Sequence, residues 1–307
     1  QIVRHLWFVN PVGDRYVFGQ RNINKILDDY VRKVERDKSL RGRWWDLITS
    51  ELSRWKTGAV KQYVKTAKDK GKPPLFESED IQFWPNRSDE IPDDNSIKLI
   101  FTDYTLPLTS VISEEDLTRE ERTLSIRQRV ASTPEEACDA VRDLYNTYGQ
   151  TPRNYKNTVF FLVADRNLVE KNGPVGYTKQ LMALEEMLKD REGLQTLIGE
   201  PGIKAVERLK ADTIRDLRPS CVAAYRFLVY PSGGGLSALE LGEERRAIEQ
   251  FLTLVEERLD DQANKILRSM TTEALLDRYW PKRKERVEVR DLVEGFYRRP
   301  EIEVIES

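Results

Sequence analysis

The sequence predicts an α/β protein with a small, mainly parallel sheet covered by long helices, preceded by a β-hairpin and a helical arm and followed by a short helical tail. Three near-continuous apolar runs carry this prediction: Lys98–Asp103, Thr158–Asp165 and Val222–Tyr230. Stretches with apolar residues at helical spacing separate these runs. Strands that are buried on both faces have such compositions, and parallel strands are usually joined through helices. We therefore expect the three strands to run parallel in one sheet.

The first 75 residues predict a β-hairpin and a basic helical arm. Strand-like segments at Ile2–Val9 and Tyr16–Phe18 flank the turn-forming segment Asn10–Asp14. Asn22 is a candidate N-cap for the helices that follow. Their two apolar stripes are Ile23, Ile26, Leu27, Tyr30, Val31 and Val34, and then Trp44, Leu47, Ile48, Leu52 and Trp55. Lys72–Pro74 ends this segment.

Residues 76–270 predict an α/β domain with three or more parallel strands. Between the first two strands, Thr133, Pro134 and Glu136 combine an N-cap, a proline at the first helical position and a glutamate three residues after the cap. The apolar face of this helix contains Ala137, Val141, Leu144, Tyr145 and Tyr148. Further helices are expected around Leu181–Leu188, Ile203–Ile214 and Ala247–Leu267.

Residues 271–307 predict a small helical tail. Two short helical segments, around Leu275 and Leu292, are separated by the basic run Lys282–Arg286. The expected domains are therefore residues 1–75, 76–270 and 271–307.

Composition favours a cytoplasmic protein. Charged residues make up 33% of the 307 residues, the net charge is only −2, and Cys138 and Cys221 are the only cysteines. No apolar stretch approaches the ~20 residues that cross a bilayer. Because the chain starts at Gln1 directly in a strand-like segment, we expect it to be a part of a longer polypeptide.

Charge is distributed unevenly along the chain. Residues 15–72 contain 16 Lys and Arg against 7 Asp and Glu, a net charge of +9, whereas residues 77–120 contain 3 against 12, a net charge of −9. Basic side chains can neutralise phosphates, and exposed rings can stack on bases. The candidate nucleic-acid contacts are Arg41, Arg43, Arg54, Lys56, Lys61, Lys65 and Lys68. Two alternatives stay open: the tryptophans interleaved with these residues form core, and the basic face docks onto the acidic segment.

Two glycine-containing stretches fall short of phosphate-binding loops. Gly173–Lys179 has the wrong spacing for a P-loop and no hydroxyl residue after its lysine, and Ser232–Gly235 lacks the GxGxxG pattern. We expect a loop before a helix in the first case and a flexible connection in the second.

A possible strand-end site consists of Asp103 and Asp165, which each end an apolar strand. Ligands of open α/β sheets gather at the carboxyl ends of strands, so these acids and the loop at Gly233 could form an enzyme site. The alternative is that each acid caps the following loop or helix. His5 is the only histidine, so no histidine dyad can form, and we expect no metal site and no cofactor in this chain.

The order of several short motifs resembles a known family. These motifs are Tyr16–Phe18, Asn22–Leu27, Phe83–Pro85, Ile91–Asp94, Ile97–Ile100 and Asn157–Asp165, followed in the tail by Tyr279–Pro281, Val289 and Asp291–Phe296. In this order they resemble the region after the nucleotide-binding core in large AAA-type P-loop ATPases, a family catalogued as a domain of unknown function and often labelled anti-phage-associated. The resemblance covers most of the chain.

The resemblance implies a portion of an ATP-dependent machine in prokaryotic phage defence or DNA metabolism. It implies an upstream ATPase domain as a partner, with ATP and magnesium bound by the parent protein, while DNA and further copies of the chain are other partners that stay open. This chain lacks the Walker A, Walker B and sensor motifs, so no catalytic residue is carried over. We expect the chain alone not to hydrolyse ATP and its matched motifs to determine the fold.

Overall fold

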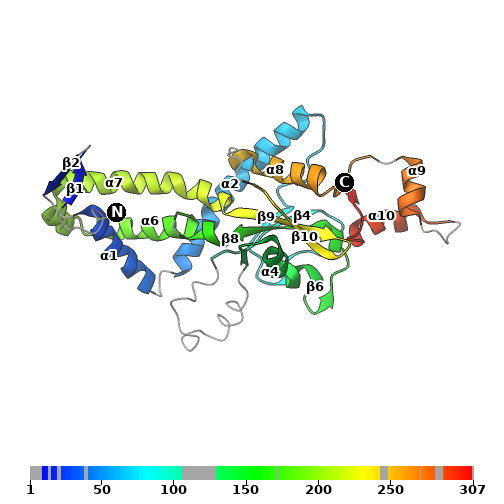
Figure 1. The fold of residues 1–307 in the computed structure, drawn as a ribbon, viewed down its shortest axis with the longest axis horizontal. Helices are drawn as coiled ribbons and strands as arrows, with labels where there is room; N and C mark the ends of the chain where they lie inside the picture. The colour runs from blue at the N-terminus through cyan, green and yellow to red at the C-terminus, as the bar shows by residue number, and fades with distance from the viewer. Residues whose placement is uncertain are drawn as a thin grey trace. The chain divides into compact units, whose positions relative to one another are not determined.

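The computed structural model describes residues 9–12, 15–18, 22–37, 41–105, 129–170, 172–242, 248–269, 271–280 and 286–305. It has a mixed α/β fold, and its chain forms two compact units (Figure 1). The first unit comprises residues 1–53 and 168–224, and the second comprises residues 54–167 and 225–307. Each unit is therefore assembled from two separate segments, in contrast to the three continuous domains expected from the sequence.

A β-hairpin opens the first unit. Strands β1 (Val9–Val12) and β2 (Arg15–Phe18) pair antiparallel, which confirms the predicted hairpin. The predicted turn was placed too early, because Asn10 and Pro11 belong to β1 and strand pairing continues to a two-residue connection. The segment that contains His5 lies outside the described residues.

The rest of the first unit is helical. Its helices are α1 (Ile23–Arg36), the first part of α2 (Arg41–Asp69), α6 (Pro174–Lys189) and α7 (Arg191–Ala223). Helix α1 begins where predicted, because the side-chain oxygen of Asn22 accepts a hydrogen bond from the Asn24 N–H at 2.9 Å. Helices α6 and α7 lie side by side (Figure 1), and α7 kinks at Gly199, whose φ is 63°. The predicted helices at 181–188 and 203–214 are confirmed as parts of α6 and α7.

A six-stranded sheet forms the centre of the second unit. Its strands are β3 (Ile81–Phe83), β4 (Lys98–Phe101), β5 (Val130–Ala131), β8 (Val159–Asp165), β9 (Tyr225–Ser232) and β10 (Gly235–Glu240). The order is β10-β9-β8-β4-β3, with β5 also paired to β8. Strands β3, β4, β5 and β8 are parallel, which confirms a small, mainly parallel sheet.

Strand β9 runs antiparallel to β8, and the expectation that all three apolar runs would be parallel is wrong for this strand. The chain leaves β8 through the short helix α5 (Arg166–Val169) and then follows the α6–α7 hairpin. A pair of antiparallel helices returns the chain to the sheet edge that it left, so Tyr225 at the start of β9 pairs with Ala164 near the end of β8. A parallel crossover would instead have carried the chain to the opposite edge.

Helices cover both faces of this sheet. On one face, α4 (Pro134–Asn146) packs Val141 and Leu144 against Phe161 and other buried strand residues. On the other face, Trp55 of α2 contacts the rings of Phe101 in β4 and Phe251 in α8 (Phe251–Glu257). Strand β4 is completely buried and β8 almost so, as expected for strands with near-continuous apolar sequences.

Helix α4 has the predicted start. The hydroxyl of Thr133 accepts a hydrogen bond from the Glu136 N–H at 3.3 Å, and a Glu136 carboxylate oxygen accepts one from the Ser132 N–H at 2.9 Å. Tyr148, which was predicted to share the apolar face of this helix, lies beyond its end in a short strand and is 39% exposed.

The helix predicted over 247–267 is shorter than expected. Helix α8 continues into the π-helical turn η8 (Arg258–Gln262) and ends there, because Asn264 adopts a φ of 52°. The Lys265 N–H then donates to the Leu259 carbonyl at 2.9 Å, a bond typical of a helix C-cap. Residues 266 and 267 form strand β11 instead of a helical turn.

The predicted helical tail packs into the second unit. Its elements are α9 (Thr272–Ala274), η9 (Leu275–Tyr279), α10 (Val289–Arg298) and β12 (Val304–Ile305), which follow strand β11 (Ile266–Leu267). Strands β11 and β12 are parallel, and Asn157 donates to the Phe296 carbonyl at 2.5 Å. The basic run of the tail lies outside the described residues except for Arg286.

Short elements complete the second unit: η3 (Ser88–Glu90), β6 (Thr147–Tyr148), β7 (Thr151–Pro152), η6 (Lys156–Thr158) and η7 (Ile248–Gln250). Among the helices of the described residues, none combines the length and apolar character that a bilayer crossing requires.

Candidate functional site

Helix α2 presents four of the candidate basic residues on one exposed face within the second unit. Arg54, Lys61, Lys65 and Lys68 follow one another at intervals of seven, four and three residues, which places them on the same side of a helix. All four are exposed. We refer to these four residues together with Gly58, which lies among them, as the basic face of α2.

The lysines of the basic face are available to a ligand. Within the described part of the chain, Lys61, Lys65 and Lys68 form no ion pair or side-chain hydrogen bond. The opposite side of the same helix segment is core, since Trp55, Ala59 and Tyr63 are at most 3% exposed. Apart from Lys56, which lies on the core side, this segment of α2 therefore has an apolar side and a cationic side.

The other three candidate residues, Lys56, Arg43 and Arg41, do not belong to the basic face. The Lys56 ammonium donates to the Ile81 carbonyl at 2.7 Å, and burial lowers its pKa, while Asp80 and Glu79 act in the opposite direction. Arg43 forms an ion pair with Glu185 inside the first unit. Arg41 is the first residue of α2, and its side chain is outside the described part of the structure.

The tryptophans of α2 are mainly core residues. Trp44 is 7% and Trp55 is 3% exposed, and the indole N–H of Trp55 donates to the Ile248 carbonyl at 2.8 Å. Only Trp45, at 44%, exposes a large ring among these three. The interpretation of Trp44 and Trp55 as core is confirmed, and they offer no stacking surface for bases.

The acidic segment finds its partners largely outside α2. Asp94 pairs with Lys98 at 2.5 Å, Asp93 lies 4.0 Å from Arg153, and Arg87 pairs with Asp89 at 3.1 Å. Residues 106–120 of the predicted acidic segment lie outside the described residues. Whether the basic arm also contacts those residues stays a prediction.

The two strand-end aspartates cap local backbone. Asp103 is 2% exposed, and its carboxylate accepts hydrogen bonds from the Thr105 N–H at 2.7 Å and hydroxyl at 2.6 Å. Asp165 accepts from the Asn167 N–H at 2.8 Å. Strand β5 pairs with β8 beyond the end of β4, so it occupies the place beside Asp165. This geometry favours the capping interpretation over a shared ligand site.

Both glycine stretches have structural roles. Gly173 precedes α6 as its N-cap, and a Cβ there would lie 1.8 Å from the Leu168 carbonyl oxygen, so only glycine fits. Gly233 and Gly234 form the turn of the β9–β10 hairpin, in which Ser232 pairs with Gly235. Because β9 is antiparallel to β8, this turn lies at the opposite end of the sheet from the strand-end aspartates, and the expected grouping of all three is wrong.

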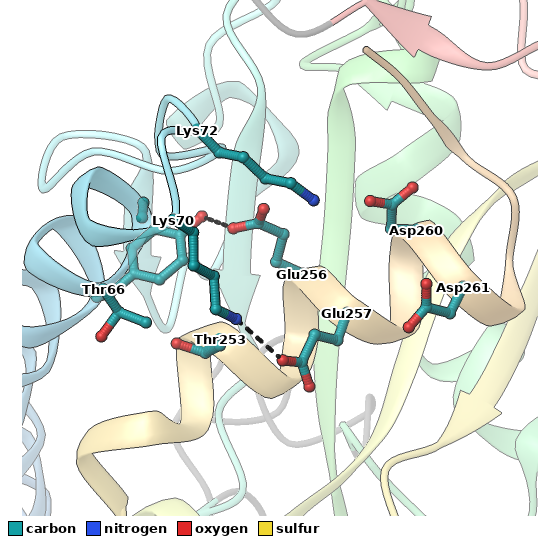
Figure 2. Close-up of a pocket in the computed structure, with 10 residues that line it drawn as sticks. Thr66, Lys70, Lys72, Thr253, Glu256, Glu257, Asp260 and Asp261 are labelled. Atoms are coloured by element: carbon teal, nitrogen blue, oxygen red, sulfur yellow. Dashed lines mark hydrogen bonds and ion pairs between the residues drawn. The ribbon is translucent and has the colours of Figure 1, made fainter.

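A polar pocket that the sequence did not reveal lies between the end of α2 and α8 (Figure 2). It has a cavity volume of ≈ 230 Å³. Its lining comprises Tyr63, Thr66, Ala67, Lys70, Lys72, Thr253, Glu256, Glu257, Asp260 and Asp261. The lining residues come from segments almost 200 positions apart, and no spacing pattern in the sequence connects them.

The charges of this pocket are largely compensated. The Tyr63 hydroxyl donates a hydrogen bond to Glu256. Figure 2 shows the Lys70 ammonium paired with Glu257, 3.6 Å away. Arg268 pairs with Glu256 and, at 3.0 Å, with Asp260. The four carboxylates of the lining therefore exceed the three nearby cations, Lys70, Lys72 and Arg268, by only one charge.

Among the described residues, no group of three or more His, Cys, Asp or Glu side chains lies close enough to hold a metal ion. Cys138 and Cys221 are both free thiols, and burial raises the pKa of Cys138. No protein-family model, curated protein or solved structure matches this chain.

Proposed function

We propose that this chain is a non-catalytic portion of a prokaryotic AAA-type ATPase of phage defence or DNA metabolism, serving coupling, assembly or substrate contact in the cytoplasm. The proposal depends on one observation: residues of the short motifs that resemble the ATPase family form contacts that hold this fold together. Trp84 donates to the Tyr225 hydroxyl at 2.8 Å, and the ring of Tyr279 contacts that of Phe296. Asn157 binds the backbone of the tail.

The surroundings of the strand ends also support a non-catalytic role. Asp103 and Asp165 already accept hydrogen bonds from nearby backbone groups, Gly173 is needed for a helix start, and Gly233 lies in a hairpin turn. An upstream ATPase domain is the partner that this proposal requires, and self-association is compatible with it.

Measurements of ATP turnover and of calorimetric binding of magnesium-ATP test this proposal on the 307-residue chain. We expect no turnover above the buffer blank and no binding heat. Robust hydrolysis would contradict the proposal. If hydrolysis were found and then abolished by Asp103→Asn with Asp165→Asn, at unchanged thermal stability, the strand ends would be the active site.

Nucleic-acid binding through the basic arm is the second candidate function. The specific observation that favours it is the exposed basic face of α2, whose three lysines have no ionic partner in the described part of the chain. An electrophoretic shift of DNA at low salt that is lost when Lys65→Glu and Lys68→Glu are combined would support this function. The absence of any shift at low salt would exclude it.

A further inference from the structure

Gly58 occupies the middle of the basic face without a structural reason. A Cβ built on it would meet nothing within 4 Å, so no neighbouring group requires its small size. It lies inside α2 and is exposed. Glycine within a helix destabilises it relative to alanine, because glycine loses more backbone freedom on folding. The position therefore carries a destabilising residue that the packing of this chain does not explain.

The neighbours of Gly58 indicate what could use the open helix backbone. Gly58 follows Arg54 by four residues and precedes Lys61 by three, so cationic side chains flank it on the same face. A ligand held by the flanking cations can thus approach the helix backbone closely at this point.

The length of the basic face fits a polyanion. From Arg54 to Lys68 the helix rises about 21 Å, at about 1.5 Å per residue. One strand of duplex DNA carries about 6 phosphates over that length, at one charge per about 3.4 Å of helix axis. Phosphates are thus numerous enough for all four cations to find a partner at once.

The placement of the aromatic rings favours a duplex over a single strand. Proteins that hold single strands usually stack bases on exposed rings. In this segment of α2, Trp55 and Tyr63 are the aromatic residues, and they are 3% and 1% exposed. Contacts from the basic face are thus limited to the sugar-phosphate backbone, which a duplex presents while its bases are enclosed.

We propose that the basic face of α2 (Arg54, Gly58, Lys61, Lys65 and Lys68) binds the sugar-phosphate backbone of duplex DNA without reading its sequence, with one backbone strand seated against the helix at Gly58. This inference rests on the nucleic-acid-binding function proposed above and adds the ligand form, the contact residues and the role of the glycine.

Substitutions of Gly58 give the sharpest test, because stability and binding should change in opposite directions. Gly58→Ala is expected to raise the melting temperature and to weaken binding of a 20-base-pair DNA duplex several-fold, as measured by fluorescence anisotropy. Gly58→Leu is expected to weaken binding further, at a melting temperature no lower than that of the unchanged chain. Unchanged affinity in both variants would contradict close approach at Gly58.

Charge reversal tests the lysines. For four phosphate contacts, log K should fall with log salt concentration at a slope of about −3.6, and Lys61→Glu with Lys65→Glu should reduce that slope by about 2. Lys204→Glu with Arg208→Glu is the matched control: it changes the net charge equally at two exposed positions of α7 and should leave the slope unchanged.

Further probes separate failure of the inference from failure of the function. A second duplex of unrelated sequence should bind equally, and a single strand should bind more weakly. Stronger binding of the single strand would overturn the inference. A salt-dependence slope that changes only in the α7 control variant would overturn it too. In both cases the DNA-binding function itself would stand. No binding to any of these DNAs at low salt would overturn both.

Discussion

Buried polar residues of this protein serve the fold. Arg153, whose side chain is fully buried, donates to the carbonyls of Ser88 at 2.9 Å, Ile91 at 3.1 Å and Pro92 at 3.0 Å. One guanidinium thus satisfies three carbonyl groups of an irregular loop, which arginine can do because its donors have a fixed planar arrangement. Such a residue has the appearance of a functional charge in the sequence but is committed to structure.

Arg153→Met should destabilise the chain by about 3–5 kcal/mol, because it leaves three carbonyls without their donor and the buried Asp93 carboxylate without its nearby cation. Urea unfolding followed by circular dichroism measures the change. The control is Arg142→Met, which removes an exposed ion pair with Asp139 and should change the free energy of unfolding by less than about 1 kcal/mol. Equal effects of the two substitutions would show that the Arg153 contacts add little.

Lys265 should make stability depend on pH. Burial lowers its pKa to about 8, although Glu303 and Glu301 act to raise it. In the unfolded chain its pKa is about 10.4, so between these values the unfolded state binds more protons and the free energy of unfolding rises with pH. We expect Lys265 to contribute a rise of about 1–2 kcal/mol from pH 8 to pH 9.5.

Unfolding of the Lys265→Met variant across the same pH range checks this expectation. The variant retains the titrations of all other groups, so its free energy of unfolding should rise less steeply than that of the unchanged chain. Parallel curves for the two proteins would mean that Lys265 keeps its proton in the folded state throughout this range.

At the scale of elements, local chemistry decided what could be predicted. The starts of α1 and α4 were predicted correctly because Asn22 and Thr133 satisfy backbone groups two or three residues away. The direction of β9 and the pocket at α8 depend on contacts between residues far apart in the chain, which no local pattern contains. The candidate basic residues were chosen from their charge and the aromatic residues among them, but the hydrogen bond from Lys56 to the Ile81 carbonyl depends on the fold.

The end of the η8 turn depends on one backbone conformation. Asn264 has a φ of 52°, which asparagine and glycine adopt more readily than other residues. Asn264→Ala should therefore lower the free energy of unfolding by about 1 kcal/mol, whereas Asn264→Gly should be neutral or slightly stabilising. Thermal unfolding of both variants decides the point, and a larger loss for glycine than for alanine would show that the asparagine side chain, rather than its φ, ends the helix.

At the scale of the whole molecule, the order of strands predicts an order of stability within the sheet. Strand β8 is almost completely buried and has strands on both sides, whereas β10 is a half-buried edge strand. Hydrogen exchange should thus be slowest in β8 and measurably faster in β10, since edge amides are released by local opening. Mass spectrometry of exchanged peptides measures both strands in one experiment. Equal protection would indicate that the sheet opens only as a unit.

The direct pairing of Ala164 with Tyr225 has a consequence for how this chain could vary between relatives. The chain between these two residues, which contains α5, α6 and α7, therefore leaves the sheet and returns to it at neighbouring positions. Helices α6 and α7 could therefore lengthen, shorten or exchange for another module during evolution without shifting the register of any strand, as happens at sites of domain insertion. We would look for variation in length within this excursion, and for constancy of the strands on either side of it.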